Sequence, residues 1–270
     1  MNRVLLLRIL AAQRLKLLIV MVAMGLWGFL MPVIYAEFGQ QFERLLESGI
    51  FPAEFQQLSQ FGGADITSLA GAIALGFIHP ISVALLAVFG VGFTVAAVAG
   101  ERQRGTLEIL LARPVSRRGL YGTLAVAVLI FLGLVILAAL AGALIGSALW
   151  NVLDRLETAN LPLLWFNVLL LHAAFAAIAL AASVSFNRLT PAIGIALAVL
   201  LVSYFLEVIG SLWPDAQFLQ PYSLFHYLQP IAVLEGKVEA SNLIVLGAVT
   251  VVAVVYALIV FPRRDLAAPS

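Results

Sequence analysis

The chain has 270 residues, of which 63% are hydrophobic and only 11% are charged. A soluble domain carries roughly 25% charged residues and could not bury this much apolar surface, so the expected surroundings are the lipid bilayer. The net charge of +1 gives no electrostatic indication of nucleic-acid binding, and the lack of cysteine excludes disulfides, thiolate metal sites and cysteine nucleophiles.

Six apolar stretches are each long enough to cross a membrane as a helix, because about 20 residues span the hydrocarbon core. The sequence therefore predicts an all-α membrane protein with six transmembrane helices, built as one domain over residues 1–270. We expect a short helix over residues 1–16, in the cytoplasm or at the membrane interface, to precede the first span. The predicted spans cover residues 17–36, 69–99, 119–149, 163–184, 191–213 and 242–261.

The second and third spans each contain more than 30 residues. As helices they would be about 45 Å long, which exceeds a hydrocarbon core of roughly 30 Å, so they must tilt, protrude or break. Pro80 is the expected kink, because proline lacks an N–H and clashes with the preceding turn. His79 is expected to bond the backbone carbonyl that this proline leaves free, and the pair His79 and Pro80 is a candidate for a translocation pathway or gate.

The basic residues fall almost entirely on one side of this six-span arrangement. Of the 15 Lys and Arg residues, only Arg44, Arg155 and Lys237 lie on the other side, which carries most of the acidic residues. Because positively charged loops stay inside, both termini are expected in the cytoplasm. The expected location is a prokaryotic inner membrane, with the chain crossing it several times.

One dense polar stretch, residues 101–118, lies between the second and third spans and reads ERQRGTLEILLARPVSRR. At helical spacing Glu101, Arg104 and Glu108 share a face, with an ion pair expected between Arg104 and Glu108. Leu107, Leu110 and Leu111 fall opposite, and Pro114 ends the helix after Arg113. Two interpretations stay open: a loop with membrane-boundary anchors such as Arg117 and Arg118, or a docking helix that presents its charged face to a soluble partner.

This stretch resembles the loop between the second and third spans of ABC-2 type permeases, which commonly carry E-x-x-x-G-T-L-E followed by an R-P-V-S-R-like sequence. Arg104 and Arg113 lie within the same pattern. The six-span plan with a polar outer segment at 214–241 is also similar to that family, and residues 220–230 resemble a stretch of its nitrous-oxide-reductase maturation subgroup. The matching residues are Glu101, Gly105, Thr106, Leu107, Glu108, Pro114, Val115, Ser116 and Arg117.

The resemblance implies the permease subunit of an ATP-binding cassette transporter, with export as the prevailing direction. It implies a homodimer that binds two copies of a cytoplasmic ATPase, with residues 101–117 as the coupling helix seated in a groove of that ATPase. The chain has no G-x-x-x-x-G-K-[ST] phosphate loop, so no catalytic residue and no cofactor are expected in it. ATP and Mg would be bound by the partner. The substrate is not set, and a role in delivering force rather than cargo stays open.

Glu207 is the only acidic residue inside a predicted span. Charged groups in the membrane are costly and usually functional, which makes Glu207 a candidate for the pathway or a gate. It lies about 24 Å along the helix from the cytoplasmic start of its span, so a locally paired or snorkelling residue is the alternative. His172 is expected to bond a neighbouring helix. No metal site is expected, because the three histidines are far apart in sequence.

Small and apolar residues give weaker predictions. Gly142 and Gly146 form a G-x-x-x-G pattern, which fits packing inside one subunit or a seam between two copies. Phe38 and Phe42, with Leu45 and Leu46, suggest a short amphipathic helix on the outer membrane surface.

Two other function classes are alternatives to the permease. An intramembrane enzyme needs its catalytic groups at one depth, whereas Ser183 and His172 are more than ten residues apart on one helix. A secondary transporter or channel would be expected to show buried charges, broken helices and an inverted repeat, of which the sequence shows only Glu207. Co-purification of an ATPase would separate the permease from both.

Overall fold

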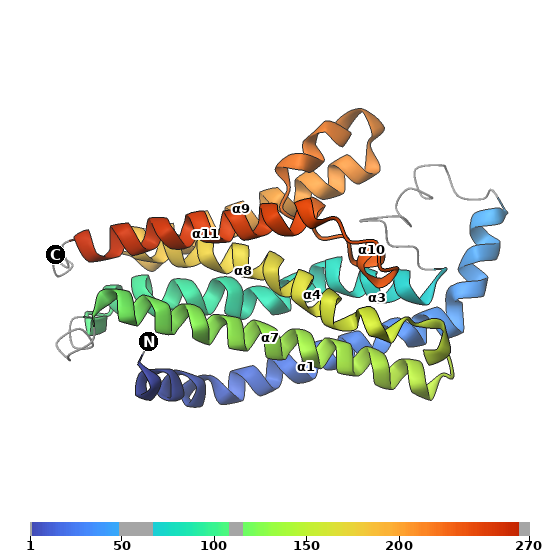
Figure 1. Ribbon diagram of the computed structural model, residues 1–270, viewed down its shortest axis with the longest axis horizontal. Coiled ribbons are helices and arrows are strands. Elements are labelled where there is room, and N and C mark those ends of the chain that lie inside the picture. Colours follow the sequence, from blue (N-terminus) through green and yellow to red (C-terminus); the bar gives the residue numbers. More distant parts are fainter. Residues whose placement is uncertain (1, 49–66, 108–115, 265–270) are drawn as a thin grey trace.

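The computed structural model describes residues 2–48, 67–107 and 116–264, and all structural statements below concern these residues (Figure 1). The described part is helical without a strand, and it contains six helices that are long and apolar enough to cross a membrane. The prediction of an all-α, six-span membrane protein is therefore confirmed. In chain order the main helices are α1 (Arg3–Glu47), α3 (Leu69–Ile78), α4 (Pro80–Ala87), α5 (Glu101–Gln103), α7 (Arg117–Leu149), α8 (Leu161–Ser185), α9 (Leu189–Leu212), α10 (Pro230–Leu234) and α11 (Ala240–Arg263).

Shorter or wider helical pieces join these elements. Two π-helical segments follow α4, and 3₁₀ turns connect α7 to α8 and α9 to α10. They are η2 (Val88–Phe93), η3 (Ala96–Gly100), η4 (Leu153–Arg155), η5 (Thr158–Asn160), η6 (Pro214–Tyr222) and η7 (Phe225–Tyr227).

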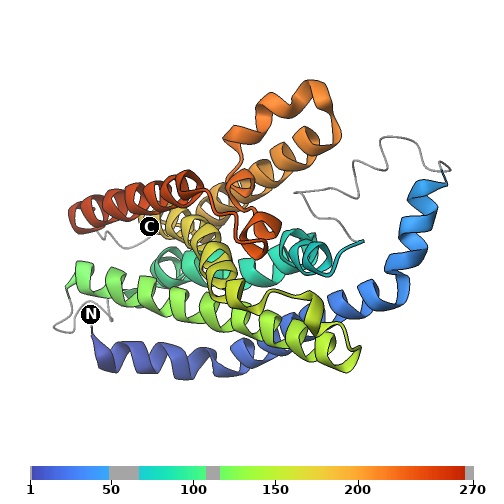
Figure 2. The same ribbon diagram turned by 45° about the vertical axis from the view of Figure 1, so that its right-hand side comes forward.

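The first helix, α1, is continuous over 45 residues, so the segment 1–16 does not form a separate helix. Its first 22 residues contain neither glycine nor proline and are rich in Leu, Ala, Arg and Lys, which favour helix, so nothing interrupts the run into the span. At the other end, Phe38 and Phe42 belong to the final turns of α1, which point away from the bundle, instead of to a helix of their own (Figure 2). The side chains of Leu45 and Leu46 lie outside the described set.

The second span is broken at His79 instead of merely kinked. His79 has an extended backbone with ψ of 143°, because a residue before proline is pushed out of the α region, and Pro80 then begins α4. The expected bond from His79 to a freed carbonyl is wrong: its Nδ1 accepts the Ile81 N–H at 3.2 Å and so caps α4. The ten residues of α3 are too few to cross the bilayer, so the span proper is Pro80–Gln103.

The closest helix pair is α1 with α7, which run side by side along the bundle (Figure 1). A Cβ atom added to Gly28 would lie 2.1 Å from the Ala139 carbonyl oxygen, and one added to Gly142 would lie 2.0 Å from the Gly25 carbonyl oxygen. At Gly146 it would lie 2.7 Å from the Phe29 carbonyl oxygen. The G-x-x-x-G pattern therefore packs α7 against α1 within one subunit, and it is not a seam between copies.

The remaining spans differ in how much of their surface is buried within the protein. α8 lies in the centre, with 78% of its most apolar window buried, whereas α11 buries only 11% and α9 only 28%. The outer faces of α9 and α11 are apolar and exposed, so they face lipid or another chain. Both ends of the described chain lie at one end of the bundle, called here the termini end, together with the start of α7 (Figure 1).

Gly142→Ala should lower the thermal stability of the protein in detergent, because the new methyl group meets the Gly25 carbonyl and forces α1 and α7 apart. Overpacking of this kind costs about 1–3 kcal/mol. Gly122→Ala is the matched control: it lies on the same helix with no atom within 4 Å of the new Cβ, and alanine favours helix over glycine by about 1 kcal/mol. Thermal unfolding should show a lower Tm for the first variant only, and equal Tm values would contradict the packing assignment.

Candidate functional site

Residues 101–107 form a compact turn at the termini end, held together by one carboxylate. Glu101 accepts hydrogen bonds from the Arg104 guanidinium and the Thr106 hydroxyl, and that hydroxyl also lies 3.1 Å from the Glu101 carbonyl oxygen. Gly105 has a φ of 71°, which only glycine adopts without strain. The ion pair of Arg104 is thus made with Glu101. Its expected partner Glu108 lies outside the described residues, as do Leu110, Leu111, Arg113, Pro114 and Val115.

This turn exposes one face and anchors the other. Gln103, Arg104, Gly105 and Thr106 are exposed, whereas Leu107 is 1% exposed and belongs to the main hydrophobic core. Leu107 therefore packs against protein and does not rest on the membrane interface. The result is a short polar surface on a fixed base, as a docking element requires.

The turn is also tied to the fifth span by a residue that the sequence did not indicate. The Gln103 side-chain oxygen accepts the Leu189 N–H at 2.8 Å and so satisfies a free donor in the first turn of α9. Arg188, the residue at the cap position of α9, makes no such bond with its own side chain. Because the two partners are 86 residues apart, no local sequence pattern could have predicted the contact.

Ser116 and Arg117 resume the described chain and fasten helix ends. The Ser116 hydroxyl accepts the Gly119 N–H at 3.0 Å and caps the start of α7. The Arg117 guanidinium donates to the carbonyls of Phe261, Pro262 and Arg264 at 3.2, 3.1 and 2.6 Å. A cation at the end of a helix satisfies free carbonyls and complements the helix dipole, so Arg117 is a clasp on α11.

The clasp continues into α8. The Arg264 guanidinium donates to the Val184 carbonyl at 3.3 Å and to the Asn187 side-chain oxygen at 2.8 Å. The start of α7 and the ends of α8 and α11 are therefore joined through two arginines at the termini end. Arg117 therefore bonds another helix, in addition to any role as an anchor at the membrane boundary.

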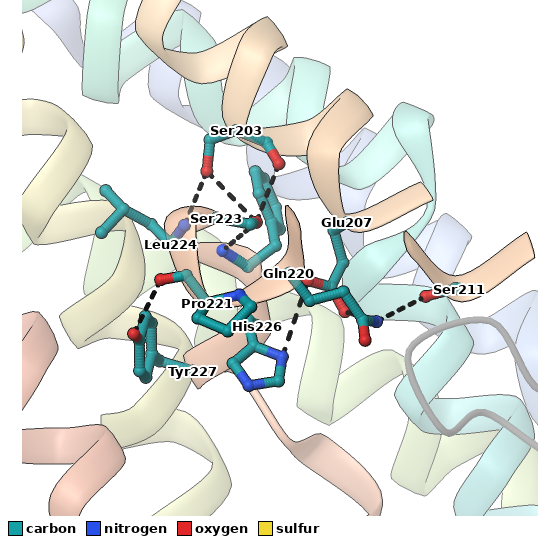
Figure 3. Close-up of polar contacts among 10 residues, drawn as sticks. Ser203, Glu207, Ser211, Gln220, Pro221, Ser223, Leu224, His226 and Tyr227 are labelled. Atoms are coloured by element: carbon teal, nitrogen blue, oxygen red, sulfur yellow. Dashed lines mark hydrogen bonds and ion pairs between the residues drawn. The ribbon is translucent and has the colours of Figure 1, made fainter. Parts of the chain in front are cut away.

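A second polar site lies near the opposite end of the bundle, where η6 and η7 fold back on α9 (Figure 3). Glu207 on α9 is only 7% exposed, and its Oε1 accepts a hydrogen bond from the Gln220 side chain at 3.1 Å. Gln220 also donates to the Ser211 hydroxyl at 3.2 Å. The close fit of this pair needs Gly210, where a Cβ would lie 2.3 Å from Gln220 Cγ. Glu207 is thus locally paired, and it clasps η6 to its own helix.

His226 completes the surroundings of the carboxylate. Its Nδ1 lies 3.9 Å from Glu207 Oε2, an oxygen that accepts no hydrogen bond from the residues described here. Burial lowers the pKa of His226 below its usual value, and the opposing effect of the Glu239 carboxylate is smaller. The lowered pKa disfavours the imidazolium form that an ion pair with Glu207 would require.

Two serines fasten η6 and η7 to α9 at a second level. The Ser223 hydroxyl donates to the Ser203 carbonyl at 2.8 Å and accepts the Phe225 N–H at 3.0 Å, and the Ser203 hydroxyl accepts the Leu224 N–H at 2.7 Å. The Leu224 and Phe225 N–H groups would otherwise lack these partners, which is costly where they are buried. Residues 214–227 are thus held to α9 at two points, as Figure 3 shows.

The other candidate residues are not brought to this site. His79 stacks on Trp27 with ring centroids 4.7 Å apart, and in the described chain neither a hydrogen bond nor an ion pair joins His79 or Pro80 to Glu207. His172 lies 2.9 Å from the Val168 carbonyl of its own helix, not a neighbouring one. Within the described ranges no cluster of three metal-binding side chains occurs.

A small cavity of about 60 Å³ lies among α7, α8 and α11. Its walls are apolar apart from the hydroxyl groups of Thr94, Tyr121 and Thr250.

Comparison with known protein families gives one match. The model of the family described as ABC-2 family transporter protein matches residues 14–266, which is nearly the whole chain. No curated protein matches it. With six spans and a match of this length, the chain belongs to the ABC-2 family of transporter proteins, as the multi-pass permease subunit of an ABC transporter.

Proposed function

We propose that this permease exports a substrate across a prokaryotic inner membrane, driven by ATP that a separate cytoplasmic ATPase binds with Mg and hydrolyses. The observation that carries the proposal is the turn 101–107, whose polar face is exposed while Glu101 and Leu107 hold its base. Residues 101–117 would be the coupling element. The ATPase would therefore dock at the termini end, which would face the cytoplasm, as the distribution of Lys and Arg favours.

Two copies of the permease would carry two ATPase subunits. The exposed apolar faces of α9 and α11 support a homodimer, because they offer large unpaired surfaces along the full length of two spans. Lipid would cover the part of these apolar faces that the second copy leaves exposed. A pathway between copies would also fit the cavity among α7, α8 and α11, which has only about 60 Å³. Membership of the nitrous-oxide-reductase maturation subgroup stays a prediction.

Glu207 and the segment 214–227 would act as the outer gate. The segment is held to α9 by side-chain hydrogen bonds and not by a continuous helix, so it can separate from α9 without breaking a span. Each neutral hydrogen bond contributes about 0.5–1.5 kcal/mol, which a conformational change driven by ATP can supply.

A secondary transporter or channel without an ATPase is the alternative. The break at His79 favours it to some degree, since discontinuous spans are common in such proteins. The presence or absence of a co-purifying ATPase decides between the two.

Arg104→Glu should weaken ATPase binding, because it reverses the charge of the exposed face and places a second carboxylate beside Glu101. Tagged protein would be isolated from its native membrane in mild detergent, and the eluate assayed for ATP hydrolysis. We expect about tenfold less co-eluting ATPase, equivalent to about 1.4 kcal/mol of binding energy.

Arg118→Glu is the matched control for this experiment. It makes the same charge change at an exposed position of the termini end, outside the turn 101–107. Equal loss in both variants would mean that net charge, and not this turn, determines binding. If wild-type protein brings down no ATPase in any mild detergent, the ABC mechanism is refuted and the alternative gains.

Gln220→Leu should release the outer segment from α9, because it removes the donors to Glu207 and Ser211 together. Hydrogen–deuterium exchange of amides 214–222 should rise about tenfold, as expected for the loss of two hydrogen bonds. Gln217→Leu makes the same change at an exposed position of η6 and should leave the exchange unaltered. Unchanged exchange in Gln220→Leu would show that the clasp does not hold the segment.

A further inference from the structure

A serine hydroxyl from α8 lies inside the backbone hydrogen-bond ladder of the second span. The Ser183 hydroxyl donates to the Val95 carbonyl at 2.8 Å and accepts the Ala99 N–H at 3.0 Å. In an α-helix this N–H would bond that carbonyl directly, because the two residues are four apart. The hydroxyl therefore replaces one backbone hydrogen bond, and its residue is 0% exposed.

The span is widened around the insertion. Residues 88–93 and 96–100 are π-helical, and we call residues 88–100 the π tract. Such turns are rare and frequently occur at functional sites, and a side chain inserted into the ladder is a known cause of distortion. Thr94 supports the wide turns as well, because its hydroxyl lies 2.7 Å from both the Gly90 and Val91 carbonyls.

The π tract lies directly before the turn 101–107. It ends at Gly100, and Glu101 begins α5. Two residues after Glu101, Gln103 bonds the first turn of α9. Any rotation transmitted between the turn and the membrane part of the second span must therefore pass through the π tract.

The Ala179 carbonyl, one turn before Ser183 in α8, is an alternative acceptor for the inserted hydroxyl. Ser185, two residues along the same helix, donates to the carbonyl of Ala181, four residues before it, at 2.7 Å. Ser183 could donate to its own helix in the same way, toward Ala179, and Ala99 N–H would then bond the Val95 carbonyl. Every polar group keeps a partner in both arrangements, so they differ little in hydrogen-bond energy.

We propose that Ser183 is a positioning residue for energy coupling: its hydroxyl opens the π tract in one state of the transport cycle and leaves it in the other. Withdrawal closes one wide turn to α-helix, which shifts the register by one residue and turns Glu101–Leu107 by about 100° relative to the span. This inference rests on the proposed coupling role of that turn. Ser183 acts through the backbone of the second span and does not touch substrate.

The test measures hydrogen–deuterium exchange of amides 95–103 in the purified permease–ATPase complex, with and without a non-hydrolysable ATP analogue. In the wild type we expect the nucleotide to change exchange at these amides about threefold or more. In Ser183→Ala the tract is closed in both conditions, so the nucleotide effect should vanish while ATPase co-purification is kept. Ser185→Ala, which removes a hydroxyl that bonds only outside the π tract, should behave as wild type.

Ser183→Thr and Ser183→Val form a second, matched pair, because the two side chains have nearly the same shape and differ in the hydroxyl. The nucleotide effect should persist in the threonine variant and be lost in the valine variant, which separates the hydroxyl from any packing defect. A nucleotide effect of wild-type size in both Ser183→Ala and Ser183→Val overturns the proposal, as does its absence from the wild-type complex. Failure to isolate any ATPase with the wild type overturns the coupling role itself, and this inference with it.

Discussion

One constraint determines most of this structure: inside the bilayer, each backbone N–H and C=O group must form its hydrogen bond within the protein. The six spans meet it by being helical, and the irregular places meet it with side chains. His79 caps α4 where Pro80 breaks the second span, Ser183 replaces a missing backbone bond, and Arg117 covers the last carbonyls of α11. These polar side chains form hydrogen bonds with backbone groups that lack a backbone partner.

The two polar sites differ in how they use the same chemistry. At the termini end, charged groups bond helix ends across long sequence separations and join α7, α8 and α11 into one unit. At the opposite end, side-chain hydrogen bonds hold a 3₁₀ segment to a single helix. The first arrangement suits transmission of a push between spans, and the second suits a part that opens and closes.

The sequence was sufficient to predict the features that depend on composition or on neighbouring residues. Apolar length predicted the six spans, Pro80 marked the break, and the pattern from Glu101 to Arg117 indicated the family. It was insufficient where partners are distant. Gln103 with Leu189, and Arg117 with the end of α11, are contacts between residues 86 to 147 positions apart, for which no spacing rule exists. The π tract was missed because its cause, Ser183, is on another helix.

The glycine contact between α1 and α7 also bears on how the protein is made. Gly25 and Gly28 emerge from the ribosome more than one hundred residues before Gly142 and Ala139, the residues of α7 that they face. Helices in membranes insert first and associate afterwards. The face of the first span that contains Gly25 and Gly28 therefore has no partner helix until the third span is inserted. The broken second span is inserted before that. The contact along this glycine face thus forms only when the third crossing is in place, and a chain halted before that point lacks the partner surface for this face of its first helix.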